Sequence, residues 1–87
     1  MYKQEIIDKV NAIMGRKADI DPKGIAPEDY YDELGADSIQ CIEALLEIED
    51  AFGIDIPGSR VLNVSTMQQV YDVVGEIIVE TYGFELY

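Results

Sequence analysis

Histidine is absent from this sequence of 87 residues, and Cys41 is its single cysteine. Without histidine, the chain cannot form the Ser-His or Cys-His pairs that activate many nucleophiles. The same absence removes the usual nitrogen ligands of zinc, and a single cysteine cannot form an intramolecular disulfide. We therefore expect no catalytic residues and no metal site, so the protein is not expected to be an enzyme.

Positive charge is also scarce. Six Lys and Arg residues stand against 18 Asp and Glu residues, so the formal net charge is -12, and after Lys23 the only basic residue is Arg60. Such a surface repels nucleic-acid phosphates and anionic lipid head groups, whereas it attracts proteins with basic patches. We expect protein partners and no nucleic acid.

Long apolar runs are missing as well. No stretch approaches the roughly 20 apolar residues that cross a bilayer, and charges interrupt the N-terminal segment MYKQEIIDKV. We expect no membrane insertion and a soluble, cytoplasmic protein. A hydrophobic content of 48% suits a folded globule with one modest core. We expect a monomeric single domain over residues 1–87, with its core at about 2–82 and a tail at 83–87.

Hydrophobic periodicity predicts three major helices. Apolar residues in 2–14 recur at spacings of three and four, and Gly15 follows in the position of a C-terminal cap. A second helix is predicted from Ser38 to Phe52, closing at Gly53. A last helix begins after Ser65 or Thr66 as the cap and ends near Glu80 to Tyr82.

Two connections separate these helices. Residues 16–37 lose the helical period and gather turn formers, so we expect a long ordered loop with a helical turn near PEDYYDEL. The apolar residues expected to fix this loop to the core are Ile20, Ile25, Tyr30 and Leu34. The segment IDIPGSRVLNV predicts a short third helix of one or two turns. The expected fold is all-α, a small four-helix bundle with three major helices, one short third helix and a long first loop.

The predicted second helix has two apolar stripes. Its core face is formed by Cys41, Ala44, Leu45, Ile48 and Phe52. A second stripe lies about 130° away on the helical wheel and is fringed by Glu43, Glu47 and Asp50; its members are Ile39, Ile42 and Leu46. One explanation is that a loop or the third helix covers this stripe, and a second is that its members are isolated exposed apolar residues, which are normal on protein surfaces. The alternative is a docking strip whose acidic rim attracts a basic partner.

Ser38 stands at the start of this helix. Asp37 can serve as the N-cap, and Gln40 completes a capping box, so the hydroxyl of Ser38 faces water in the first turn. An Asp-Ser pair at a helix start is, in most proteins, explained by capping alone.

The residues around Ser38 resemble the attachment motif of the acyl carrier protein family, Leu-Gly-x-Asp-Ser-Leu followed by an acidic, apolar helix. The chain reads Leu34, Gly35, Ala36, Asp37, Ser38, Ile39, and then Glu43 and Glu47. The similarity continues through FGIDIP and VSTMQQVYDVV, so it covers nearly the whole chain as a single carrier domain.

The resemblance implies that Ser38 carries 4'-phosphopantetheine, which a phosphopantetheinyl transferase adds from coenzyme A, with acyl groups held as thioesters on the arm. It places Gly35, Asp37 and Ile39 at the attachment site. It also implies a docking surface for acyl-loading, condensing and other acyl-processing enzymes, formed by Ile42, Glu43, Leu46 and Glu47. Cys41 is interpreted as a small buried hydrophobe, and the residues that could shelter the acyl chain are Leu45, Ile48, Val64, Tyr71 and Val74.

Three departures from the family pattern leave the pathway open. Gln40 replaces an acidic residue, Ile39 replaces leucine, and PGSRVLN contains Arg60 in place of an acidic run. Fatty-acid-like, polyketide, peptide-hybrid and other specialised acyl pathways therefore remain alternatives.

Two other functions are considered. An unmodified helical adaptor would use the same acidic face without a covalent arm. A calcium loop would begin with Asp19, Asp21 and Gly24, but Lys23 and Tyr30 occupy positions where calcium ligands belong.

Overall fold

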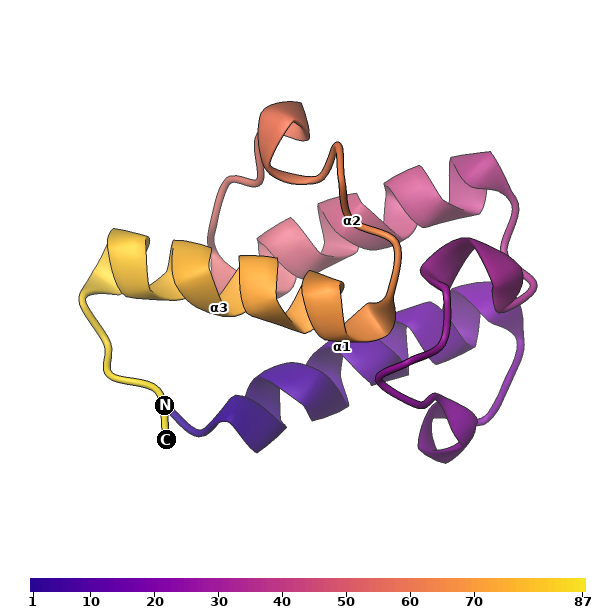
Figure 1. The fold of residues 1–87 in the computed structure, drawn as a ribbon, viewed down its shortest axis with the longest axis horizontal. Coiled ribbons are helices and arrows are strands. Elements are labelled where there is room, and N and C mark those ends of the chain that lie inside the picture. The colour runs from indigo at the N-terminus through magenta and orange to yellow at the C-terminus, as the bar shows by residue number, and fades with distance from the viewer.

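Three α-helices and three 3₁₀ turns, with no strand, form the fold in the computed structural model, which describes residues 1–87. The helices are α1 (Lys3–Ala18), α2 (Ser38–Phe52) and α3 (Met67–Tyr82), and the turns are Pro22–Gly24, Tyr31–Glu33 and Gly58–Arg60. Both α2 and α3 pack against α1 (Figure 1), within principal extents of 34 × 25 × 21 Å. None of the helices is long and apolar enough to cross a membrane.

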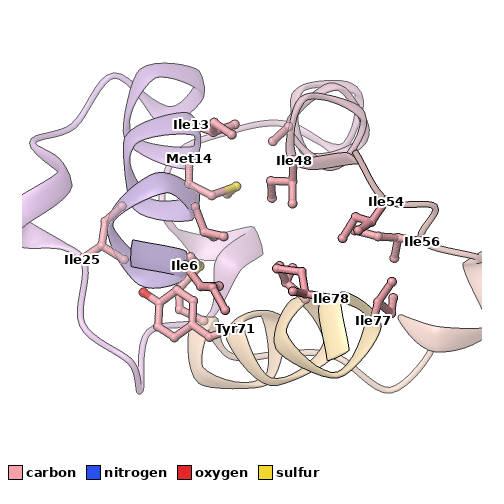
Figure 2. Close-up of a cluster of buried hydrophobic side chains, with 14 residues drawn as sticks. Ile6, Ile13, Met14, Ile25, Ile48, Ile54, Ile56, Tyr71, Ile77 and Ile78 are labelled. Atoms are coloured by element: carbon pink, nitrogen blue, oxygen red, sulfur yellow. The ribbon is translucent and has the colours of Figure 1, made fainter. Parts of the chain in front are cut away.

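The core lies where the apolar faces of the three helices meet. Figure 2 shows Ile6, Ile13 and Met14 of α1 approaching Ile48 of α2 and Ile78 of α3. The full buried cluster consists of Ile6, Val10, Ile13, Met14, Ile25, Ala44, Ile48, Ile54, Ile56, Met67, Tyr71, Val74, Ile77 and Ile78. On the predicted core face of α2, Ala44 and Ile48 are buried, whereas the other members are partly exposed.

The first helix ends later than predicted. Asp19, in a left-handed conformation with φ 58°, is the C-terminal cap, and Gly15 lies inside α1. Gly15 is buried, and a Cβ atom there would lie 2.9 Å from the carbonyl oxygen of Ile20. The glycine therefore allows the chain to return closely over the helix, while Asp19 tolerates the left-handed conformation.

The long loop is anchored by partly different residues from those predicted. Ile25 is buried and Leu34 packs on the core, but Ile20 and Tyr30 are exposed. Tyr30 forms an antiparallel bridge with Thr66. Because successive side chains of an extended segment point in opposite directions, the next residue, Tyr31, packs on the core instead.

The predicted short third helix forms only as a single 3₁₀ turn, Gly58–Arg60, between α2 and α3. The all-α class is confirmed, and the four-helix bundle is confirmed only in part, because three α-helices form. Gly58 and Asn63 have low helix propensity. Arg60 fixes the segment from the side, since its guanidinium lies 3.0 Å from Glu80 and 3.1 Å from Glu76 of α3.

The tail at 83–87 docks against the N-terminus. The amide of Tyr87 donates to the carbonyl of Met1 at 3.1 Å, and the amide of Lys3 donates to the carbonyl of Tyr87 at 3.0 Å. Leu86 packs against the core cluster. The two termini therefore lie side by side (Figure 1).

Candidate functional site

Ser38 is the first residue of α2, and its side chain is exposed. The predicted capping box is present: Asp37 accepts from the Gln40 amide at 2.8 Å, and Gln40 Oε1 accepts from the Asp37 amide at 2.9 Å. The amides of Ser38 and Ile39 belong to the first turn, where an α-helix provides no carbonyl partner. The helix therefore presents a hydroxyl beside unpaired donors at its positive end.

Gly35 guides the chain into this position. Its φ of 117° lies in the region that favours glycine, and a Cβ atom would lie 3.3 Å from the Ala18 carbonyl oxygen. Ala36, the next residue, is buried. The motif therefore passes close to the end of α1 before α2 begins, which leaves Ser38 on the outside.

An apolar cavity of about 620 Å³ lies beside Ser38, and 13 of its 16 lining residues are hydrophobic. Four of the five predicted wall residues line it, namely Leu45, Ile48, Val64 and Val74. Tyr71 does not, because it faces α1 and its hydroxyl donates to Asn11 Oδ1. Sequence reasoning missed Val61, Val70 and Val73 as further walls; the periodicity of α3 indicated the two valines of that helix as apolar without showing what they face.

Cys41 lies in the cavity wall and is only half-buried, so its prediction as a buried hydrophobe holds in part. Burial raises the pKa of its thiol, and the nearby carboxylates of Asp32 and Asp37 raise it further. The thiol is therefore held mainly in its protonated, weakly nucleophilic form at neutral pH.

The second apolar stripe of α2 is uncovered. Ile39, Ile42 and Leu46 have exposed fractions of 68%, 61% and 55%. Neither the long loop nor the 3₁₀ turn at Gly58–Arg60 covers them, so the first explanation of the stripe is wrong. We call Ile39, Ile42 and Leu46 the apolar strip.

The acidic residues beside the strip contact α1, which was not predicted. Lys17 Nζ lies 3.1 Å from Glu43 and 2.9 Å from Glu47, and Arg16 also pairs with Glu47. The hydrogen bonds that Lys17 donates to Glu47 and Glu43 raise the pKa of the Lys17 ammonium. The bond from Lys17 likewise holds the pKa of the Glu47 carboxyl below its usual range.

Comparisons with known proteins identify the family. The family model described as "Phosphopantetheine attachment site" matches residues 8–74. An acyl carrier protein of Thermosynechococcus vestitus is 33% identical over 85% of this chain and 93% of its own length. The chain belongs to the acyl carrier protein family. It is a carrier of acyl groups on covalently attached 4'-phosphopantetheine, and not an enzyme.

Other relatives agree with this assignment. An acyl carrier protein of Chlorobium phaeovibrioides is 36% identical over 85% of the carrier and 96% of its own length. A solved structure of the acyl carrier protein from Enterococcus faecalis superposes with a TM-score of 0.72 at 28% identity, covering 88% of the carrier and 99% of that chain.

The residues at the start of α2 fit the prosthetic group. Its phosphodiester is an anion, which the first-turn amides and the helix dipole favour. The nearest carboxylate, Asp37, is engaged by the Gln40 amide at 2.8 Å. The hydroxyl of Ser38 is exposed, and the adjoining cavity is apolar. By contrast, Asp21 of the calcium alternative caps a turn by accepting from the Lys23 amide, and no three candidate ligands of a metal ion come together.

Proposed function

We propose that Ser38 is the attachment residue and that the carrier delivers its acyl thioesters to successive acyl-processing enzymes. The observation that carries this proposal is the position of Ser38, whose exposed hydroxyl stands at the positive end of α2 beside both the cavity and the apolar strip. No other serine or threonine of the chain starts an α-helix with an unengaged side chain, because Thr66 accepts from the Gln69 amide as the cap of α3.

The carrier supplies the acceptor and the transferase supplies the base. No histidine exists in the chain, and the Asp37 carboxylate is occupied by its capping bond. A phosphopantetheinyl transferase must therefore remove the proton of Ser38 as the serine oxygen bonds to the pantetheine-bearing phosphorus of coenzyme A. The bond from that phosphorus to the bridging pyrophosphate oxygen breaks, and 3'-phosphoadenosine 5'-phosphate leaves. Gly35, Asp37 and Ile39 hold the backbone around the serine and would border the attached phosphodiester.

The docking surface combines the apolar strip with Glu43 and Glu47. Three exposed aliphatic side chains offer contact area, and the flanking carboxylates favour a partner whose apolar recess is ringed by Lys and Arg. Such complementarity speeds association and leaves binding sensitive to salt. This combination suits a carrier that visits several enzymes in turn.

The cavity beside Ser38 gives the acyl chain a place to shelter. Its walls are mostly aliphatic, and the three polar residues of the lining are Asp32, Asp37 and Ser38. An unsubstituted hydrocarbon chain would therefore lose contact with water there without burying polar groups of its own. Leu45, Ile48, Val64 and Val74 are the proposed contacts. A fatty-acid-like hydrocarbon chain fits this lining best, whereas the oxygen atoms of a polyketide chain would need hydrogen-bond partners there. Gln40, Ile39 and Arg60 favour a dedicated pathway over primary fatty-acid synthesis.

The oligomeric and cellular states are also part of the proposal. With a net charge of -12, two copies repel each other at low salt. We therefore propose that the carrier is a monomer. A cytoplasmic location is a separate part of the proposal and does not rest on this charge. Sedimentation at low and high salt tests the monomer, which a dimer at low salt would contradict.

Loading of the purified protein tests the attachment residue. Incubation with coenzyme A and a broad-specificity phosphopantetheinyl transferase should add one arm, seen as a single increment in intact mass. Ser38→Ala should add none, while the matched control Ser59→Ala, at another exposed serine, should load like the wild type. Loading of Ser38→Ala would show that the attachment residue is wrong.

An unmodified adaptor is the alternative. It would bind basic partners through the same apolar strip, yet it would remain bare after incubation with several transferases. Failure of the wild type to load would therefore favour the adaptor.

A further inference from the structure

Two of the six basic residues of the chain, Arg16 and Lys17, contact Glu43 and Glu47, the carboxylates of the proposed docking surface. Lys17 contacts both Glu43 and Glu47, and Arg16 contacts Glu47. These pairs join residues 26 to 31 positions apart in the sequence. Glu43 lies one helical turn after Ile39, and Glu47 lies one turn after Glu43, so the paired carboxylates border the apolar strip along α2.

The two basic side chains differ in accessibility. The Lys17 side chain is only 19% exposed, so its aliphatic part is covered while its ammonium reaches both carboxylates. The Arg16 side chain is 63% exposed. A partner can therefore displace Arg16 with little rearrangement, whereas displacing Lys17 from Glu43 and Glu47 requires a largely covered side chain to move.

Stability is a weak explanation for this arrangement. Ion pairs between solvent-exposed side chains contribute little to folding, because solvent screens them and ordering the side chains costs entropy. They also act on a charged partner, because a partner's Lys or Arg must compete with a positive charge that is already in place beside Glu43 and Glu47. Binding then exchanges one ion pair for another instead of forming a new one.

We propose that Arg16 and Lys17 are specificity-determining residues that compete with partner enzymes for Glu43 and Glu47. The inference rests on the proposed function, in which these carboxylates face the partners. Enzymes that recognise a carrier through basic residues alone gain little from this surface. Enzymes that also offer an apolar recess for Ile39, Ile42 and Leu46 keep their affinity, so the competition selects among partners.

The loading reaction measures this competition. The double variant Arg16→Gln/Lys17→Gln should load with a KM about three- to tenfold lower than the wild type, with a broad-specificity phosphopantetheinyl transferase and coenzyme A. Its KM should also rise more steeply with NaCl, because the freed carboxylates then form new pairs with the transferase. Arg16→Gln alone, at the more exposed residue, should show a smaller change in the same direction.

The matched control is Lys3→Gln/Lys9→Gln, which makes the same change in net charge on α1 at residues that form no ion pair. If the Arg16→Gln/Lys17→Gln variant changes KM and its salt dependence no more than this control, the competition is disproved. Circular dichroism verifies that each variant is folded.

A third variant separates this inference from the proposed docking surface. Glu43→Gln/Glu47→Gln should raise the KM for loading. A raised KM here, together with no effect in Arg16→Gln/Lys17→Gln, overturns the competition alone. An unchanged KM in Glu43→Gln/Glu47→Gln overturns the docking role of the carboxylates and the competition with it. Attachment at Ser38 is tested separately, by the intact mass of Ser38→Ala after loading.

Discussion

Ser38 owes its position to its immediate neighbours. Asp37 and Gln40 exchange side-chain hydrogen bonds with each other's amides, so α2 begins at the serine and turns its hydroxyl outward. This arrangement could be predicted from sequence because a capping box uses residues three apart in the chain. The cap of α1 could not, since the choice of Asp19 over Gly15 depends on the close return of Ile20.

The thiol of Cys41 should react slowly with alkylating reagents. Burial and the charges of Asp32 and Asp37 raise its pKa, so less thiolate is present near pH 8 than at an exposed cysteine. Alkylation of the unloaded protein by iodoacetamide, followed by intact mass, should be slower than for Ser59→Cys made in a Cys41→Ala background. Equal rates for the two thiols would contradict this expectation.

Glu47 should titrate below the ordinary value of 4.5, because Lys17 donates a hydrogen bond to its carboxylate. A lowered folded-state pKa means that the pair's contribution to stability is present above pH 4.5 and is lost as the pH falls through the folded pKa. NMR titration of the Glu47 side-chain carboxyl should show the low midpoint, and Lys17→Gln should raise it. An unchanged midpoint in Lys17→Gln would show that the pair does not form in solution.

The elements themselves were predictable to different degrees. The outward stripe of α2 follows from helical periodicity, which is a local property, and the structure leaves Ile39, Ile42 and Leu46 exposed as that periodicity indicates. The fate of Tyr30 and Tyr31 depends on pairing with residues near Thr66, far away in sequence. The ion pairs of Arg16 and Lys17 likewise depend on how α1 crosses α2, which periodicity does not specify.

Gly15→Ala should destabilise the fold although alanine is the better helix former. The gain in helix propensity is about 1 kcal/mol, but the new Cβ would lie 2.9 Å from the Ile20 carbonyl oxygen and 3.0 Å from Pro22 Cγ. Because one of these neighbours is backbone, overpacking should cost about 1–3 kcal/mol, so after the gain in helix propensity of about 1 kcal/mol we expect a net loss of up to about 2 kcal/mol. Urea unfolding measures it. Gly24→Ala, with no atom within 4 Å of its Cβ, is the control and should change stability far less.

The whole molecule carries a strong excess of negative charge. Only five ion pairs form, and all of them use Arg16, Lys17 or Arg60. Most of the 18 acidic residues are therefore unpaired and repel one another near neutral pH. Net repulsion, and not pairing, is the larger electrostatic term at this scale.

Added salt should consequently raise the melting temperature. Screening weakens repulsion among many carboxylates and attraction in only a few pairs, so the balance favours the folded state. Thermal unfolding followed by circular dichroism should show a higher Tm at about 0.5 M NaCl than at about 0.01 M NaCl. The higher concentration is about five times the ionic strength at which the Debye length is about 10 Å. A lower Tm would mean that the ion pairs dominate.

The paired termini have a practical consequence. Hydrogen bonds between Met1, Lys3 and Tyr87 bring both chain ends together, and Figure 1 shows them at the left, while α2 begins at the right. A dye, an affinity tag or a resin linked through either end would therefore sit far from the serine. The immobilised protein would keep the start of α2, with Ser38, accessible to partner enzymes.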